Sequence, residues 1–137
     1  GRKMPDMLCH QGAGFEKMLD CFHYEGYTKE QMLRLWGVTP ELIHSDENSD
    51  QFGLIGSKQT TLFGMNRLVI HKILNKTIDN TFSVDIVNSG KGTADYEQGS
   101  IRIERGDFLF IPAGVGQVKL VNEGNTDLEV IECLPPV

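Results

Sequence analysis

The chain has 137 residues, which is enough for one domain with a single hydrophobic core and too few for two such domains. Its net charge of -6 at pH 7, with no run of Lys or Arg, argues against nucleic acid and against an anionic membrane surface as partners. It contains no secretory signal pattern and no apolar run of about 18 residues, so we expect a cytoplasmic protein that is not inserted into a membrane. The three cysteines, Cys9, Cys21 and Cys133, lack Cys-x-x-Cys spacing and fit reduced thiols in that compartment.

The first forty residues predict short helices. Residues 1–13 have no sustained hydrophobic period and predict an extended lead-in. Thr28 and Gln31 form a capping box that predicts the start of a helix, which Gly37 ends. Thr39-Pro40-Glu41 has the pattern of one further helical turn. An earlier helix is predicted from apolar side chains at i, i+3, i+4 and i+7, which are Phe15, Met18, Leu19 and Phe22.

An acidic segment separates these helices from a β-rich part. Residues 45–51 read SDENSDQ and contain no apolar anchor, so we expect a solvated loop. We therefore predict a helical lead-in with an acidic loop over residues 1–50 and a β-barrel over residues 51–137, together forming one globular unit.

The β-rich part consists of short β-prone segments separated by glycine turns, a pattern typical of a small antiparallel sandwich or barrel. Within it, Phe82, Val84 and Ile86 alternate with Ser83 and Asp85, which predicts a half-buried strand. We expect about eight strands. Their predicted positions are Phe52–Ile55, Thr60–Phe63, Arg67–Leu74 up to a turn at Asn75-Lys76, Phe82–Ile86, Ile101–Glu104, Phe108–Ile111, Val118–Leu120 and Leu128–Cys133.

Two of these segments are apolar on both sides. Arg67–Leu74 offers Leu68 and Ile70 to one face and Val69 to the other, and Phe108–Ile111 has no polar face at all. Such strands are typical of burial on both faces. We therefore expect a second sheet on the inside and a cover on the outside, formed by the helices, by another copy or by a missing domain.

Glycine and proline positions in the second half of the chain resemble those of a cupin barrel. Gly106-Asp107 is followed by Pro112 and Gly114, as in the second cupin motif. In metal-binding cupins a first motif supplies two His and a Glu, and the second supplies a His five residues after the Pro, where this chain has Gln117. The four histidines, His10, His23, His44 and His71, are scattered singly. The resemblance implies a mainly β fold, a cupin-type double-stranded β-helix (jelly-roll barrel), here preceded by the predicted short α-helices. The missing histidine ligands predict no metal site in this chain.

A second resemblance covers most of the chain. The segment Phe15–Phe22, followed by Leu62–Ile70, is similar to the segment that leads into the carboxy-terminal cupin of class I mannose-6-phosphate isomerases, and Gly106–Gly116 is similar to the closing line of that domain. These enzymes have two cupins, and the amino-terminal one holds zinc and interconverts mannose 6-phosphate and fructose 6-phosphate. Neither its zinc-ligand motif nor its catalytic arginine motif occurs here. The resemblance implies a non-catalytic, metal-free domain, with zinc only in the missing amino-terminal cupin of the parent.

Three residues are candidates for a ligand pocket, and each also has an ordinary structural interpretation. His71 fits a surface histidine hydrogen-bonded to a neighbour, Gln117 a polar group at the barrel mouth, and Lys119 a lysine that protects a sheet edge. If Gln117 points into the barrel, Lys119 does too, and Val118 and Leu120 point outward. The alternation of side chains along this strand does not show which of these two pairs points into the barrel. We predict no catalytic residue in this chain.

Three functions remain open at this stage. The first is the accessory cupin of a mannose-6-phosphate isomerase, whose partner is the missing catalytic cupin domain and which is inactive alone. The second is a stand-alone, metal-free cupin that binds a sugar, a sugar phosphate or another small ligand and pairs with a second copy as a homodimer. The third is a metal cupin enzyme with unusual ligands such as His71 and Gln117. The fold alone does not choose among them, because cupin barrels host many functions.

Overall fold

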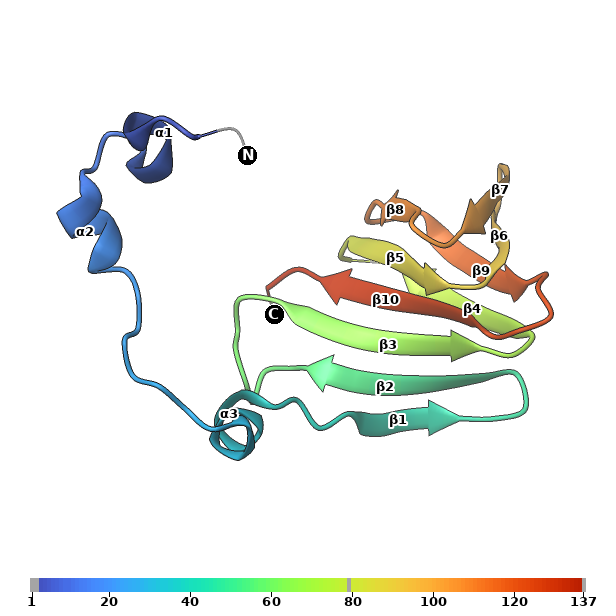
Figure 1. Ribbon diagram of the computed structural model, residues 1–137. Helices are drawn as coiled ribbons and strands as arrows, with labels where there is room; N and C mark the ends of the chain where they lie inside the picture. Colours follow the sequence, from blue (N-terminus) through green and yellow to red (C-terminus); the bar gives the residue numbers. More distant parts are fainter. Residues whose placement is uncertain (1–2, 79, 137) are drawn as a thin grey trace. The chain divides into compact units, whose positions relative to one another are not determined.

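The structure is a computed structural model that describes residues 3–78 and 80–136. The chain forms two compact units, Gly1–Gly37 and Val38–Val137. The first unit contains three short helices, and the second contains the strands (Figure 1). None of the described helices is long and apolar enough to cross a membrane.

Two of the helices described in the first unit, α2 and α3, start where the sequence predicts. Helix α2 begins at Phe15, and α3 follows Thr28, whose hydroxyl accepts a hydrogen bond from the Gln31 backbone N–H, so the predicted capping box is confirmed. The extended lead-in predicted for residues 1–13 is wrong at α1, whose short helix offers no hydrophobic period to detect. None of the three helices has a buried residue. Their bounds are α1 Asp6–His10, α2 Phe15–Leu19 and α3 Lys29–Trp36.

The strands of the second unit form two antiparallel sheets, as the sequence predicts. One sheet has six strands in the order β1-β2-β3-β10-β5-β8, and the other has four in the order β4-β9-β6-β7. The strands in the described part of the chain are β1 Glu41–Ser45, β2 Ser49–Ile55, β3 Gly64–Ile70, β4 Ile73–Ile78, β5 Ser83–Ser89, β6 Lys91–Tyr96, β7 Gly99–Glu104, β8 Phe108–Ile111, β9 Gly116–Asn122 and β10 Leu128–Leu134.

Strand structure begins earlier in the chain than the sequence predicts. The predicted helical turn at Thr39-Pro40-Glu41 is wrong, because β1 starts at Glu41 and pairs with β2. Most of the predicted acidic loop is also strand. Asp46 makes the β1–β2 turn tight, since its carboxylate accepts the backbone N–H groups of Asn48 and Ser49 at 2.7 and 2.8 Å. Residues 60–63, predicted as a strand, lie in the loop before β3.

The predicted long strand Arg67–Leu74 is divided between the two sheets. Strand β3 ends at Ile70, and β4 starts at Ile73 in the other sheet. The corner between them is held by Asn48, whose carbonyl accepts the backbone N–H groups of His71 and Lys72 at 2.9 and 3.0 Å. The turn predicted at Asn75-Lys76 is wrong, because both residues belong to β4.

An apolar core fills the space between the sheets, and its members come from almost every strand. They are Leu68, Ile70, Ile78, Val87, Ala94, Ile103, Ile111, Val118, Leu120, Leu128 and Val130. The burial expected on both faces of β8 is not found in this chain, since Phe108 is 76% and Phe110 62% exposed. The outer side of that strand has no cover among the described residues of its own unit.

Strand β5 is buried on the face opposite to the one that its alternation suggests. The polar residues Ser83 and Asp85 are fully buried, whereas Phe82 and Ile86 are exposed. Because side chains alternate across a strand, the whole apolar set of β5 up to Ile86 faces outward. Polar partners on other strands make this arrangement stable.

Candidate functional site

A cluster of charged side chains lies inside the barrel between the two sheets. Its centre is the ammonium group of Lys76 on β4, which lies 2.6 Å from a carboxylate oxygen of Asp85 on β5 and 2.7 Å from one of Glu132 on β10. The side chains of Lys76, Asp85 and Glu132 are 7%, 0% and 9% exposed. Such burial of ions requires mutual pairing, which this geometry provides.

Two neutral side chains complete the hydrogen bonding of this interior cluster. Ser83 donates its hydroxyl to the second oxygen of Asp85 at 3.0 Å and lies 3.5 Å from the Lys76 ammonium group. Asn66 on β3 donates its amide to the second oxygen of Glu132 at 2.7 Å. We call these five residues, Lys76, Ser83, Asp85, Glu132 and Asn66, the interior cluster. Each carboxylate oxygen in it therefore has a partner.

Burial and ion pairing shift the pKa of Asp85 in opposite directions. Loss of hydration raises the pKa of the Asp85 carboxyl above its ordinary value, although the Lys76 ammonium group beside it acts in the opposite direction. Burial, together with the nearby carboxylates of Asp85 and Glu132, also raises the pKa of the Cys133 thiol. Cys133 therefore stays a neutral thiol at neutral pH and is a poor nucleophile.

The interior cluster is built as a closed set of ion pairs, which limits its chemistry. The Lys76 ammonium group is occupied by two carboxylates, so it is not a free base or nucleophile. A metal does not fit here either, because a cation already stands between the two carboxylates. Within residues 3–78 and 80–136, no group of three or more His, Cys, Asp and Glu side chains could hold a metal ion.

The structure shows which side chains of β9 point into the barrel, and they are the apolar ones. Val118 and Leu120 are buried in the core, and Gln117 and Lys119 are exposed on the outer face. The side chain that enters the barrel after the turn is therefore a valine, which cannot bind a metal. Gln117 and Lys119 do not line the barrel interior.

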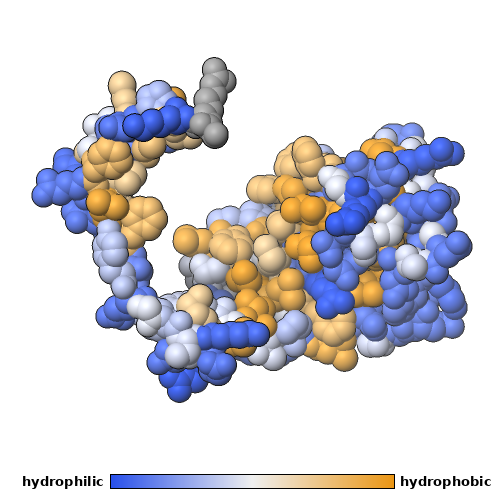
Figure 2. All heavy atoms as spheres, viewed as in Figure 1, coloured by the Kyte–Doolittle hydropathy of each residue, from blue (hydrophilic) through white to orange (hydrophobic). Residues whose placement is uncertain are grey.

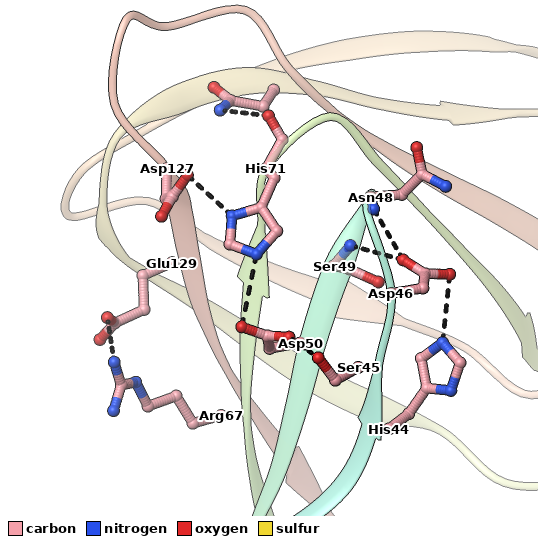
Figure 3. A network of polar contacts seen from close by, with 11 residues as sticks. His44, Ser45, Asp46, Asn48, Ser49, Asp50, Arg67, His71, Asp127 and Glu129 are labelled. Carbon is pink, nitrogen blue, oxygen red and sulfur yellow. Dashed lines mark hydrogen bonds and ion pairs between the residues drawn. The ribbon is translucent and has the colours of Figure 1, made fainter.

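His71 lies at the corner between β3 and β4, away from the barrel interior (Figure 3). Its Nε2 atom is 3.3 Å from a carboxylate oxygen of Asp50, and its Nδ1 atom is 3.0 Å from one of Asp127. The hydrogen bond to Asp127 and the two negative charges raise the pKa of His71. His71 thus joins β2 to the loop before β10.

The same end of the six-stranded sheet carries further polar contacts. Arg67 lies 3.2 Å from Glu129 and stacks over the ring of Phe52, with its guanidinium carbon 5.5 Å from the ring centroid. Asp50 also accepts a hydrogen bond from the Ser45 hydroxyl at 2.6 Å. Figure 3 shows these contacts spread over several strands on the surface rather than converging on a cavity. We interpret them as contacts that hold the strand ends together.

The three candidate residues predicted from the sequence do not lie together in the structure, and the sequence alone did not identify the interior cluster. His71, Gln117 and Lys119 lie on the surface, and the structure gives no contact between any two of them. The available signal was the presence of charges in otherwise apolar segments, as in Ile131-Glu132-Cys133. A buried charge implies a partner of opposite sign. The sequence does not say which of the many lysines that partner is.

Comparisons with known proteins identify the fold but no family. No protein-family model matches the chain, and a search of curated proteins finds no match. Among solved structures, a predicted oxalate decarboxylase from Thermotoga maritima is 19% identical with a TM-score of 0.58, covering 73% of this chain and 94% of that chain. Ectoine synthase from P. lautus is 14% identical with a TM-score of 0.58, covering 68% of this chain and 67% of that chain. Vicilin from hazelnut, Corylus avellana, is 25% identical with a TM-score of 0.58, covering 72% of this chain and 31% of that chain.

The two packed antiparallel sheets and these structural neighbours establish the class of the protein. The chain has a mainly β, cupin-type jelly-roll fold. Some proteins that share this fold are named as enzymes. Their sequence identity to this chain is too low to transfer a function to it.

Proposed function

We propose that this chain is a metal-free cupin with a structural role, equivalent to the carboxy-terminal cupin of a mannose-6-phosphate isomerase. The observation that carries the proposal is the interior cluster, in which the largely buried ammonium group of Lys76 is paired with the carboxylates of Asp85 and Glu132. In a catalytic cupin the barrel interior must instead present reactive groups to a substrate.

Isomerisation between an aldose and a ketose makes two demands on a site. A metal must polarise the carbonyl oxygens, and a base must move a proton between adjacent carbons. Here the first inward side chain of β9 is Val118, which cannot hold a metal. The buried carboxylate of Asp85 is already hydrogen-bonded to Lys76 and Ser83 and is not free to act as the base. These features support a chain that is inactive alone, with zinc and catalysis in the amino-terminal cupin of the parent.

An exposed apolar surface supports the packing of this cupin against a second protein surface. We call this surface the outer apolar face, and it consists of Phe82 just before β5, Ile86 on β5, and Phe108 and Phe110 on β8. Figure 2 shows hydrophobic side chains gathered over one end of the strand unit and hydrophilic side chains over the other. Contiguous exposed apolar side chains of this kind are typical of an interaction site. We propose the catalytic cupin of the parent as the occupant.

The test is an isomerisation assay on the purified chain. Mannose 6-phosphate is supplied with and without added zinc, and the metal content of protein purified without a metal-binding tag is measured in parallel. We expect no turnover above the buffer blank and less than a tenth of an equivalent of metal. Turnover by this chain, or one equivalent of bound zinc, would overturn the proposal.

A second experiment tests the packing partner. The reading frame upstream of Gly1 is sequenced, and the longer protein is expressed if it encodes a zinc-ligand motif. Phe108→Ser/Phe110→Ser in that protein is expected to weaken the association of the two cupins and to expose the linker to protease. A stable homodimer of the present chain that this double variant dissociates would assign the outer apolar face to a second copy instead.

The alternative function is a stand-alone, metal-free module that binds a small ligand. A cavity of about 230 Å³ at the mouth of the barrel favours it. An upstream stop codon followed closely by a start codon before this segment would support this alternative over the accessory cupin.

A further inference from the structure

A small cavity opens at the end of the barrel where β8 faces β6, β7 and β9. Its volume is about 230 Å³, and its walls include Ala94, Tyr96, Ile101, Leu109, Ile111 and Val118. Almost all of the lining is apolar. Among the described residues that line it, only Tyr96 and Gln98 carry polar side-chain groups, a hydroxyl and an amide.

The walls of this mouth cavity lie directly beside the interior cluster. Three lining residues are cross-strand partners of three cluster residues: Val118 of Lys76, Leu109 of Asp85, and Ile111 of Ser83. Partners in an antiparallel pair share a face, with Cβ atoms about 5 Å apart. A molecule in the mouth cavity would therefore sit one side chain away from the buried charges.

The charges of the interior cluster decide which ligands suit the mouth cavity. Lys76 brings one formal positive charge, and Asp85 and Glu132 bring two formal negative charges, in a region of low dielectric. An anion such as a sugar phosphate would lose its hydration there and meet no free cation. A neutral molecule meets no such penalty, and its apolar part gains by burial.

The volume of the cavity sets the size of the ligand. An apolar protein cavity of about 150 Å³ holds one benzene molecule. A cavity of about 230 Å³ therefore accommodates a single ring with one short substituent. The Tyr96 hydroxyl can donate or accept one hydrogen bond, which suits a substituent with a hydroxyl group.

We propose that the mouth cavity is a binding site for a small, uncharged, single-ring molecule with one hydroxyl-bearing substituent. The ring lies against Ile101, Leu109 and Val118, and the hydroxyl bonds Tyr96. The proposal rests on the alternative function above, since it names the ligand class of that same cavity. The isomerisation assay and the binding test are separate measurements, so either can fail without the other.

The test is a titration followed by methyl NMR, with benzyl alcohol, toluene, benzoate and mannose 6-phosphate as probes. We expect saturable shifts for benzyl alcohol at the methyl groups of Ile101, Leu109 and Val118. Binding of toluene should be weaker by a few fold, and benzoate and mannose 6-phosphate should bind at least tenfold more weakly than benzyl alcohol. No saturable shift with either neutral probe, or equal affinity for benzoate, would overturn the proposal.

Two exposed isoleucines allow a matched pair of variants. Ile101 is 45% exposed at the rim of the mouth cavity, and Ile43 is 57% exposed on β1, outside the cavity lining. Ile101→Trp fills the entrance and should weaken benzyl alcohol binding at least tenfold, whereas Ile43→Trp should leave it unchanged. Equal binding by both variants would place the ligand elsewhere.

A third variant keeps the test decisive if Ile101→Trp fails to fold. Tyr96→Phe removes only a hydroxyl group, so benzyl alcohol should bind this variant no better than toluene does. Unchanged preference for benzyl alcohol over toluene in Tyr96→Phe would contradict the assigned hydrogen bond.

Discussion

Lys76 and Asp85 connect the two sheets of the barrel through a contact of 2.6 Å between the ammonium nitrogen and a carboxylate oxygen. Lys76 belongs to β4 in the four-stranded sheet, and Asp85 belongs to β5 in the six-stranded sheet. Glu132 on β10 shares the same ammonium group. A single lysine thus ties one sheet to two strands of the other inside the core.

Replacement of Lys76 by methionine should strongly destabilise the fold. Lys76→Met keeps the length of the side chain but leaves the carboxylates of Asp85 and Glu132 buried without a cation, and we expect a loss of about 3–5 kcal/mol in the free energy of unfolding. Urea denaturation followed by circular dichroism measures this loss. Lys119→Met on neighbouring β9 is the control, with an expected change within about 0.5 kcal/mol because Lys119 is exposed. A loss below about 1 kcal/mol for Lys76→Met would show that the ion pairs are not needed for stability.

His71 should make stability depend on pH near neutrality. Its pKa is raised in the folded state by Asp127 and Asp50, so the protonated histidine favours folding. The resulting stability is fully present below the unfolded pKa of about 6.5 and is lost as the pH rises through the higher folded pKa. His71→Gln should therefore lose more stability relative to the native chain at pH 5.5 than at pH 8.5, as measured by urea unfolding at each pH.

The partner Asp127 provides the control for this pH effect. Asp127→Asn removes the largest cause of the raised pKa, so an NMR titration of the His71 ring should show a lower pKa in this variant. Glu47→Gln, a change at an exposed carboxylate paired with Lys72, should leave that titration unchanged. An His71 pKa that is the same in native chain and Asp127→Asn would contradict the assigned contact.

Neighbouring residues of β8 should differ sharply in their effect on stability. Ile111 is 6% exposed and belongs to the core, so Ile111→Ala should cost about 2–5 kcal/mol. Phe110→Ser, one position away at a side chain that is 62% exposed, should cost less than about 1 kcal/mol. Urea unfolding measures both effects. A large loss of stability in Phe110→Ser would mean that its ring is packed within this chain.

The sequence predicts where strands lie better than it predicts which face is buried. Turns rich in glycine mark β5, β8, β9 and β10, and the capping box at Thr28 marks α3, because these signals act within a few residues. The inward polar face of β5 could not be predicted from alternation, because its partners Lys76 and Glu132 lie on other strands. Burial in a strand depends on contacts that are distant in sequence.

The position of Gln117 illustrates the same limit at the candidate site. Counting from Pro112 assigns Gln117 to the inward position of a cupin, yet Val118 is the residue that enters the core. Gly114 in the turn after β8 and Gly116 at the start of β9 both have φ of 80°, and this local geometry fixes which residue faces in. A shift of one residue moves every side chain of a strand to the other face.

Gly92 on β6 should tolerate no side chain, because another strand approaches it closely. An added Cβ atom would clash with the Val121 carbonyl oxygen on β9 and would lie 3.2 Å from a Leu128 methyl group. That carbonyl belongs to a strand hydrogen-bonded on both sides, so it cannot move away without disturbing the four-stranded sheet. Gly92→Ala should therefore cost about 1–3 kcal/mol, the range seen for overpacked cores.

Gly99 on the adjacent strand β7 is the matched control for Gly92. A Cβ atom at Gly99 would meet the Tyr96 hydroxyl oxygen at 3.6 Å, which is an ordinary contact distance, and its φ is not positive. Gly99→Ala should leave the free energy of unfolding unchanged or raise it slightly, because alanine reduces the conformational freedom of the unfolded chain. Urea unfolding of both variants measures the difference. Equal stability of the two alanine variants would contradict the close approach of β9 to β6, and with it the register that places Val118 between Lys76 and Tyr96.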